Sequence, residues 1–354
     1  MIMNKKERAL IYIGNGNEYT RSFMRFKVLN TLEYTIFEKS HLPVNNLGLI
    51  DKPKIITRIL HRLRLHQDSV GVNKWLLRKV KQKDNIDFIW IDGATNIYPW
   101  VLAKLKHINS KTKIIFFSED DIIARHNTSH WFKLGLHNYD FIFTTKTFNI
   151  NELRSIGAKQ VELISDSYCE EIHHPITLTS KEKITYLADV SAIGAYEQAR
   201  YESLLYIASN GIKVNVWGGG WEGCVNKHPN LEIQNKFLYN DEYSKAIRGS
   251  KINLNFLRKM NRDTITSRSI EIPACKGFML AERTDRQKEI FNEGVEADYF
   301  SSDEELLKKI KFYLANDSKR IKIAENGFDK CINSKVSMKD VINKVIEKIS
   351  SSQK

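Results

Sequence analysis

A stretch in the last third of the chain, DTITSRSIEIPACKGFMLAERTD, places acids, hydroxyls and an arginine directly before an apolar segment. A loop that enters a helix offers unpaired backbone N–H groups and the positive end of the helix dipole, and both suit a phosphate. The hydroxyls of Thr266 and Ser267 and the guanidinium of Arg268 would add donors for a diphosphate. Glu271 follows about one helical turn later, where it could accept hydrogen bonds from ribose hydroxyls. We therefore expect a nucleotide site here, with Asp263 on the loop facing a donor sugar.

Two glycine-rich loops follow predicted strands. In YIGNGNEYTRSFMR, Gly14 and Gly16 precede a helix, but Tyr19 stands where a dinucleotide fingerprint has its third glycine. We favour a tight turn that faces a cleft, with a contact to the acceptor substrate as the functional alternative. The second loop, VNVWGGGWEG, lacks the lysine and hydroxyl of a P-loop, so we interpret it as a strand-end loop with packed tryptophans.

The composition describes a globular chain of 354 residues with a net charge of +13. Its four cysteines are scattered singly, which argues against a disulfide framework or a zinc site and fits a reducing compartment. The short apolar run near the N-terminus is soon interrupted by glycine, so it predicts neither a signal peptide nor a membrane span. We expect a cytoplasmic protein.

Residues 52–83 concentrate the positive charge. The segment reads as a pair of basic amphipathic helices, a composition that suits an anionic membrane surface. The alternative is an ordinary solvated helix face. No nucleic-acid-binding motif is present, so we expect no nucleic-acid partner. The basic residues are Lys52, Lys54, Arg58, Arg62, Arg64, Lys74, Arg78, Lys79, Lys81 and Lys83.

Strand-like apolar runs alternate with helical segments along the chain, which is typical of an α/β protein with parallel sheets. We expect six strands in residues 1–170, a linker at 171–182, a second Rossmann-like domain at 183–333 and a C-terminal helix at 334–354 that packs back on the first domain. The run KITYLADVSAIG is expected to open the second domain as a strand, and IIARHNTSHWF to form a helix capped near Ser118, Glu119 or Asp120. Two such domains would face each other across a ligand-binding cleft, the GT-B architecture.

The second half of the chain resembles the CgeB-like glycosyltransferases, relatives of the GT-B enzymes that carry an E-x7-E motif. The words that match, in order from Ile184 to Gly327, are ITYLADVSAIGAYEQAR, VWGGGWE, KINLNF, SRSIEIPACKGFMLAER, EIFNEGVEADYFSSDEELLKKIKFYLAN and RIKIAENG. The earlier run FFSEDD…YDFIFTTK also looks like the N-terminal domain of that family.

The resemblance implies roles for several residues. Glu271 matches the ribose-binding glutamate and Arg268 the arginine three residues before it. Arg200 matches a basic residue that neutralises the leaving diphosphate, and Gly194 precedes it in the same matched words. Asp263 stands where related enzymes have the first glutamate of the pair, and its shorter side chain departs from that pattern.

The implied activity is transfer of a sugar from a nucleoside-diphosphate sugar to a surface glycan or lipid-linked saccharide, at the inner face of the cell membrane. The diphosphate charge would be stabilised by arginines and helix dipoles, and the absence of a suitable D-x-D predicts that no metal or other cofactor is needed. If the reaction inverts, a general base must come from the N-terminal domain, and the candidates are Asp120 and Asp121, with His126 close behind.

Three other functions stay open from the sequence alone. A GT-B-like sugar-nucleotide epimerase or hydrolase would use the same contacts to ribose and phosphate. A nucleotide-sugar-binding protein without catalytic activity could also retain this fold. An NAD-dependent oxidoreductase is disfavoured because the first glycine loop lacks its third glycine.

Overall fold

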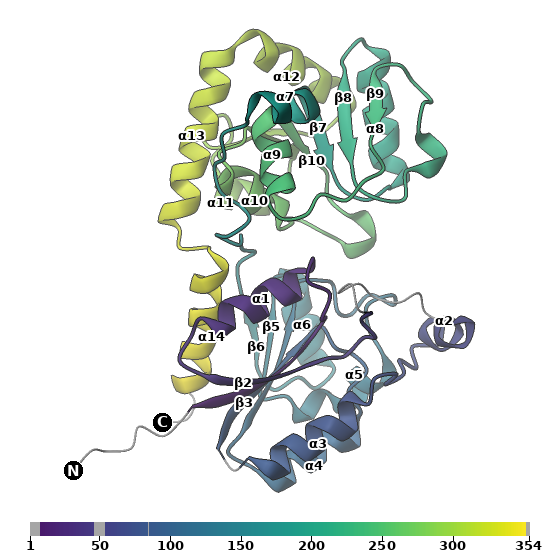
Figure 1. Ribbon diagram of the computed structural model, residues 1–354, viewed down its shortest axis with the longest axis vertical. Helices are drawn as coiled ribbons and strands as arrows, with labels where there is room; N and C mark the ends of the chain where they lie inside the picture. Colours follow the sequence, from purple (N-terminus) through teal and green to yellow (C-terminus); the bar gives the residue numbers. More distant parts are fainter. Residues whose placement is uncertain (1–7, 46–53, 84, 352–354) are drawn as a thin grey trace, which may run out of the picture. The chain divides into compact units, whose positions relative to one another are not determined.

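A computed structural model describes residues 8–45, 54–83 and 85–351 (Figure 1). The chain divides into two compact units, of which unit 1 combines Met1–Ser165 with Val341–Lys354 and unit 2 is Asp166–Asp340. Each unit contains one parallel sheet of six strands, so the predicted α/β class with two Rossmann-like sheets is confirmed. Within the described ranges, no helix combines the length and the apolar character that crossing a bilayer requires.

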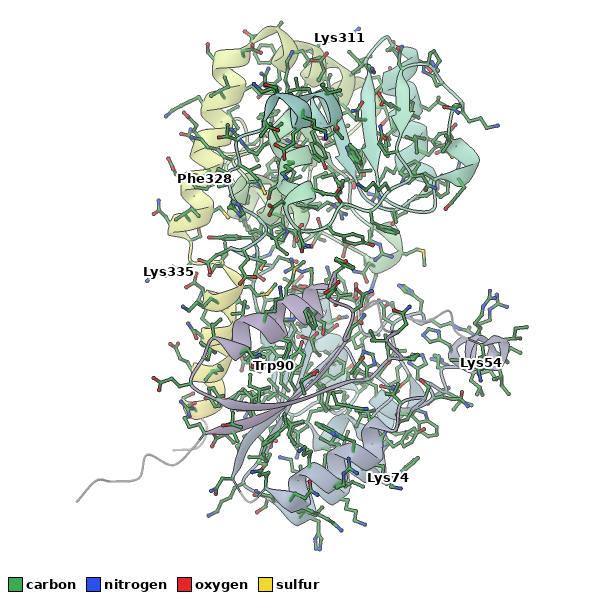
Figure 2. All side chains as sticks on the ribbon, in the orientation of Figure 1. Lys54, Lys74, Trp90, Lys311, Phe328 and Lys335 are labelled. Atoms are coloured by element: carbon green, nitrogen blue, oxygen red, sulfur yellow. The ribbon has the colours of Figure 1, made fainter. Side chains whose placement is uncertain are left out.

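The inner strands of the unit 1 sheet are nearly continuous apolar runs, as expected for parallel strands that are covered on both faces. Trp90, in the middle of this sheet, is fully buried (Figure 2). The strand order is β2-β1-β3-β4-β5-β6. The strands are β1 (Ala9–Gly14), β2 (Thr35–Ser40), β3 (Ile86–Asp92), β4 (Lys113–Ser118), β5 (Phe141–Thr144) and β6 (Val161–Leu163).

Helices connect these strands, and the final helix of the chain joins the same unit. Lys348 on α14 forms an ion pair of 3.1 Å with Glu162 on β6, and Val341, Ile342 and Val345 on α14 are buried. The helices are α1 (Arg21–Asn30), α2 (Ile55–Arg62), α3 (Val72–Gln82), α4 (Pro99–Ile108), α5 (His130–Gly135), α6 (Thr147–Ser155) and α14 (Met338–Ser351).

The helix predicted over IIARHNTSHWF is wrong for most of its length. Residues 122–127 form turns, and α5 begins only at His130. The side chain of Asp121 accepts hydrogen bonds from the backbone N–H groups of Ile123 and Ala124, both at 3.2 Å. Ser129 then caps α5 by accepting from the N–H of Phe132 at 2.9 Å. Two successive caps therefore divide the segment into a turn and a short helix.

Unit 2 repeats the architecture with the strand order β12-β11-β10-β7-β8-β9. Its strands are β7 (Ala188–Ile193), β8 (Val214–Trp217), β9 (Leu231–Ile233), β10 (Ser250–Asn255), β11 (Met279–Glu282) and β12 (Asp298–Phe300). Its helices are α7 (Ser180–Tyr186), α8 (Gln198–Ser209), α9 (Asp241–Gly249), α10 (Arg268–Ala274), α11 (Asp285–Ile290), α12 (Asp303–Ala315) and α13 (Asp317–Asn333).

The entrance to unit 2 differs from the prediction. The first part of KITYLADVSAIG belongs to helix α7, which begins inside the expected linker, and the strand starts only at Ala188. The cause is a capping box, in which the side chain of Glu182 accepts from the N–H of Thr179 at 2.9 Å and the N–H of Glu182 donates to the Thr179 hydroxyl at 3.3 Å.

Candidate functional site

Arg200, on α8, is a buried cation with little to neutralise it. Its side chain is 4% exposed, and its Nε and Nη2 atoms are buried without a hydrogen-bond partner among the described residues. The third nitrogen, Nη1, donates to the carbonyl of Ala195. Burial, and then the positive charge of Arg268, lower the pKa of Arg200 to about 10. A buried guanidinium with unused donors beside a second arginine is suited to an anion.

The backbone around Gly194 fits closely over Arg200. A Cβ atom at Gly194 would lie 2.6 Å from Arg200 Nη1, so any larger residue there would force the guanidinium to move. Gly218, in the second glycine loop, packs closely against Gly194. A Cβ atom at Gly218 would lie 2.1 Å from the Gly194 carbonyl oxygen. The indole of Trp221 donates to that oxygen at 2.9 Å. The second glycine loop therefore fixes the position of Gly194, whose backbone lies against Arg200. The two tryptophans of this segment are packed, as predicted, because Trp217 and Trp221 are both buried.

Glu271, on α10, is held by two side chains that the sequence did not indicate. Its Oε2 accepts a hydrogen bond of 2.7 Å from the hydroxyl of Tyr243 on α9, and its Oε1 lies 3.8 Å from Nε2 of His173. His173 Nδ1 accepts from the backbone N–H of Cys169 at 2.9 Å, so Nε2 carries a proton that faces the carboxylate. Burial, and then the charge of Glu271, raise the pKa of Tyr243 well above its usual value, so the phenol stays a donor. Glu271 itself is 5% exposed.

The loop before α10 uses part of the donor set that was expected to bind phosphate. The hydroxyl of Thr266 donates to Asn255 Oδ1 at 3.3 Å. The N–H groups of Ser269 and Glu271 donate to the carbonyls of Thr266 and Ser267, both at 2.9 Å. Because α10 has only seven residues, its dipole is short. Arginine side chains are therefore better placed than the helix end to attract an anion.

Asp263 lies on the loop that follows β10. The residue before it, Arg262, has a left-handed backbone with φ of 49°, and Asn261 Nδ2 donates to the Asp263 carboxylate at 2.9 Å. These neighbours fix the carboxylate within its own loop.

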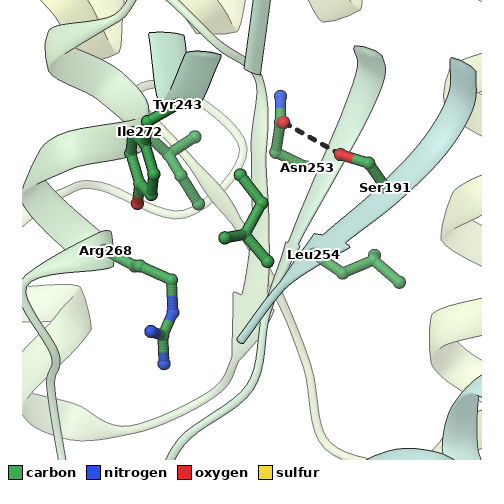
Figure 3. A pocket seen from close by; sticks show the side chains of 7 residues that line it. Ser191, Tyr243, Asn253, Leu254, Arg268 and Ile272 are labelled. Atoms are coloured by element: carbon green, nitrogen blue, oxygen red, sulfur yellow. Dashed lines mark hydrogen bonds between the residues drawn. The ribbon is translucent and has the colours of Figure 1, made fainter. Parts of the chain in front are cut away.

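A recess opens at the carboxyl ends of β7 and β10 (Figure 3). Arg268 and Tyr243 line one side of it, and a hydrogen bond of 3.2 Å from the Ser191 hydroxyl to Asn253 Oδ1 closes the other. The remaining lining residues are Ile193, Leu254 and Ile272. In open parallel sheets, ligands bind beyond the carboxyl ends of the strands, so the recess lies where a nucleotide is expected.

The predicted residues of unit 1 lie in tightly packed turns. A Cβ atom at Gly14 would lie 2.5 Å from the hydroxyl oxygen of Ser22, and the N–H of Gly16 donates to the hydroxyl of Ser40 at 3.1 Å. Both glycines therefore allow close approach of neighbouring elements.

The two acids after β4 have different environments. Asp121 is fully buried, and it accepts from Asn149 Nδ2 at 2.9 Å in addition to its two backbone donors. Asp120 is exposed, and His126 is half-buried in the following turn. Asp121 therefore has the surroundings of a capping residue, whereas Asp120 is accessible to solvent.

Unit 1 contains a buried ionic network that its sequence did not indicate. Arg25 on α1 donates to both carboxylate oxygens of Asp92 at 2.6 and 2.9 Å, and the hydroxyl of Tyr12 adds a third bond of 2.6 Å. Arg21 makes two bonds of 2.8 Å to Glu119, which also pairs with Arg25 at 2.8 Å. Although burial opposes it, the charges of Arg21 and Arg25 lower the pKa of Glu119 below its usual range. The only signal in the sequence is that both acids stand at or just after the ends of strands.

Metal-binding residues do not cluster in the described part of the chain. No group of three or more His, Cys, Asp or Glu side chains there is placed to hold a metal ion.

Comparison with known proteins connects this geometry to a family. Residues 200–346, less than half of the chain, match the family model described as glycosyl transferase-like. The matched region contains Arg200, Tyr243, Arg268 and Glu271. Among curated proteins, no significant sequence match is found.

Solved structures extend the comparison to the whole chain. The structure of Anabaena Alr3699/HepE in complex with UDP and glucose superposes with a TM-score of 0.66 at 10% identity, covering 98% of this chain and 100% of that one. A sucrose-phosphate synthase from Thermosynechococcus elongatus gives 0.68 at 11% identity, with coverage of 98% and 100%. A putative UDP-N-acetylglucosamine 2-epimerase from Listeria monocytogenes gives 0.60 at 10% identity, with coverage of 98% and 96%. The chain therefore has the GT-B fold.

Proposed function

We propose that this protein is a glycosyltransferase that moves a sugar from a nucleoside-diphosphate sugar to a saccharide or lipid-linked saccharide acceptor of a surface glycan. The observation that carries the proposal is Arg200, buried beside Arg268 with two unused guanidinium nitrogens. Breaking the bond between sugar and diphosphate builds negative charge on the leaving group, and a guanidinium fixed in advance stabilises that charge without reorganisation. The match of residues 200–346 to the glycosyl transferase-like family supports the same reading.

Different side chains of unit 2 would bind the diphosphate and the ribose of the nucleotide. Arg200 and Arg268 bind the diphosphate, and Gly194 lets the backbone approach it closely. Glu271 accepts hydrogen bonds from the ribose hydroxyls, while Tyr243 and His173 hold its carboxylate in position. Because the arginines neutralise the leaving group, we propose that the reaction needs neither a metal nor another cofactor.

The loop around α10 supplies the remaining contacts to the donor. Asp263 faces the donor sugar, and Ser267, at the start of α10, donates to a phosphate oxygen. Thr266 holds the loop through Asn255 rather than contacting phosphate through its hydroxyl.

Unit 1 would bind the acceptor. If the reaction inverts, Asp120 is better suited than Asp121 to remove the acceptor proton, because Asp120 is exposed and Asp121 is fully buried behind three donors. The turn with Gly14 and Gly16, together with His126, would then lie along the acceptor.

The proposed setting of the reaction is the cytoplasmic face of the cell membrane. The basic residues of segment 54–83 would attract anionic lipids there. Within the GT-B enzymes, we propose that the chain belongs with the CgeB-like group, a proposal supported by the resemblance of its sequence between Ile184 and Gly327.

A thermal-shift panel tests the donor site. The purified chain is heated with UDP, GDP, CDP, dTDP, CMP or NAD⁺, since a ligand that binds only the folded state raises the melting temperature by mass action. We expect a shift with one nucleoside diphosphate, loss of that shift in Glu271→Ala, and its retention in Glu232→Ala, a control at an exposed carboxylate on β9. A shift with NAD⁺ alone would contradict the proposal.

An epimerase or hydrolase acting on sugar nucleotides is the second candidate, supported by the structural likeness to the putative Listeria epimerase. Product analysis separates the two. A transferase releases nucleoside diphosphate in proportion to added acceptor, whereas an epimerase or hydrolase converts the sugar nucleotide without one. A chain that shifts with nucleotide but turns over under neither condition would be a binding protein without catalytic activity.

A further inference from the structure

Helix α2 exposes its apolar side. Ile55, Ile56, Ile59 and Leu63 are 75%, 62%, 52% and 55% exposed, and none of the described residues of α2 is buried. Ile55, Ile59 and Leu63 lie one helical turn apart with Ile56 beside them, so they form a single surface, the α2 apolar face. An exposed cluster of large apolar side chains on one helix is typical of an interaction site.

A row of basic side chains borders this face. Lys54, Arg58 and Arg62 are also one turn apart and all exposed, and Figure 2 labels Lys54 at the start of the helix. The helix sequence IITRILHR contains no acid. Apolar residues along one side and basic residues along its edge are complementary to a lipid surface that carries negative charge.

Helix α3 does not share this property. Its apolar residues Val72, Leu76 and Val80 are buried in the core of unit 1. The predicted pair of amphipathic helices is thus divided, since α3 uses its apolar stripe for folding and α2 does not. Lys52, at the start of the basic segment, lies outside the described residues.

An aromatic cluster lies next to the segment that follows α2. Trp100 is 58% exposed and stacks on Tyr98 at 4.6 Å between ring centroids. Trp131 meets both rings edge-on, at 5.5 and 5.7 Å, and its indole N–H donates to the carbonyl of His66 at 3.1 Å. Tryptophan and tyrosine favour the headgroup level of a bilayer because their rings are amphipathic.

We propose that α2 docks on an anionic lipid bilayer, with the α2 apolar face at the boundary between headgroups and acyl chains and the basic row on the headgroups. The purpose of this contact, bringing the enzyme to a lipid-linked acceptor, rests on the proposed function. The contact itself involves only residues of unit 1 and needs no donor.

Vesicle flotation of the full chain tests the proposal, with vesicles of phosphatidylcholine alone or mixed equally with phosphatidylglycerol. We expect binding to the mixed vesicles, weakening as salt screens the charges, and little binding to phosphatidylcholine. The double variant Ile55→Ser, Ile59→Ser should bind mixed vesicles about tenfold more weakly or worse. Arg58→Gln with Arg62→Gln should lose about tenfold on mixed vesicles only.

Matched controls keep the result interpretable. Ile184→Ser and Ile321→Ser remove equally exposed isoleucines from unit 2, at 87% and 52% exposure, and should leave vesicle binding unchanged. Melting temperature and the shift caused by UDP should be the same in all variants, because the changed side chains are exposed and the proposed donor site uses none of them.

Three outcomes would overturn the docking proposal: wild type that does not distinguish the two lipids, double isoleucine variants that float like wild type, or a dimer that those variants abolish while no vesicle binds. The last result would assign the α2 apolar face to a second copy of the chain. A chain that floats with mixed vesicles but does not shift with any nucleotide would support docking and argue against the glycosyltransferase proposal.

Discussion

Replacing Arg200 by methionine should stabilise unit 2 and weaken nucleotide binding at the same time. The pKa of Arg200 is lowered from 12.5 to about 10, first by burial and then by Arg268. At neutral pH the group is charged in both the folded and the unfolded state, so folding must bury a cation that is better solvated in water. A pKa difference of this size corresponds to about 3 kcal/mol of lost stability. The loss persists at all pH values below 10 and is relieved only as pH rises from 10 towards 12.5.

The net gain is smaller than this figure. Methionine loses the hydrogen bond to Ala195 and the contact of the guanidinium with the Phe256 ring at 6.0 Å, together about 1–2 kcal/mol. The expected gain of about 1 kcal/mol raises the melting temperature of a domain of this size by about 2–4 °C. The two unused nitrogens would each have made a charge-assisted hydrogen bond of about 1.5–3 kcal/mol to the diphosphate. Together they are worth about 3–6 kcal/mol, so affinity for the nucleoside diphosphate should fall by at least about a hundredfold.

Differential scanning calorimetry with and without UDP measures both effects, because UDP identifies the transition of unit 2 by raising it. Arg320→Met provides the contrast in the same unit. Arg320 is as buried as Arg200, but its Nη1 donates to the carbonyl of Tyr313 and to Asp317, both at 2.6 Å. That variant should melt lower and keep its response to UDP. If Arg200→Met melts as low as Arg320→Met and still responds to UDP, Arg200 is a structural cation and our reasoning is wrong.

Three further changes have defined outcomes. Tyr243→Phe removes the hydroxyl that donates to Glu271, so titration calorimetry should show UDP affinity reduced about five- to tenfold. Asp92→Asn removes one of the two carboxylates that pair with the buried Arg25 and leaves Glu119 as its charged partner, which should destabilise unit 1 by about 1.5–3 kcal/mol in urea unfolding while UDP binding is retained. Burial lowers the pKa of His66 to about 4, so the stability of unit 1 should be full above pH 6.5 and fall as pH drops from 6.5 towards 4, with a shallower fall in His66→Gln, as followed by thermal unfolding.

Each of these changes has a matched control. Tyr206→Phe, on α8, should bind UDP like wild type. If Tyr243→Phe also binds UDP with wild-type affinity, Glu271 does not contact the nucleotide. Asp189→Asn breaks a surface pair with Lys251 and should cost less than about 1 kcal/mol; an equally small loss in Asp92→Asn would argue against the buried network. His107→Gln, at an exposed position, should keep the wild-type dependence of unit 1 stability on pH. If His66→Gln also keeps it, His66 is not the cause of the loss of stability at low pH.

The regular part of the fold could be predicted because the inner strands of unit 1, β1, β3, β4 and β5, are isolated apolar runs between polar turns. The run IDFIWID, for example, is buried along nearly its whole length as β3. The prediction was wrong or silent where local hydrogen bonds decide the structure. Thr179 and Glu182 start a helix in a segment whose apolar residues suggest a strand, and β12 has only three residues, too few to show a period.

The candidate site was only partly visible for a different reason. The sequence indicated Arg200, Arg268 and Glu271 because they lie in segments that resemble the CgeB-like glycosyltransferases. By contrast, Tyr243 reaches Glu271 from 28 residues away and His173 from the other end of unit 2, and neither has a local pattern. Packing also decides between α2 and α3, which have similar compositions and opposite exposure. Sequence periodicity shows that a helix has an apolar side, but it does not show whether the rest of the chain covers that side.

The return of α14 to unit 1 has a consequence for synthesis. Unit 2 is one continuous stretch, whereas unit 1 receives Val341, Ile342 and Val345 from residues that the ribosome makes after all of unit 2. Domains generally fold as they emerge, so unit 2 can form its sheet while unit 1 still lacks part of its cover. During that interval the apolar patch that α14 later covers is open to solvent, and a nascent chain stalled before Val341 should be a preferred client of chaperones.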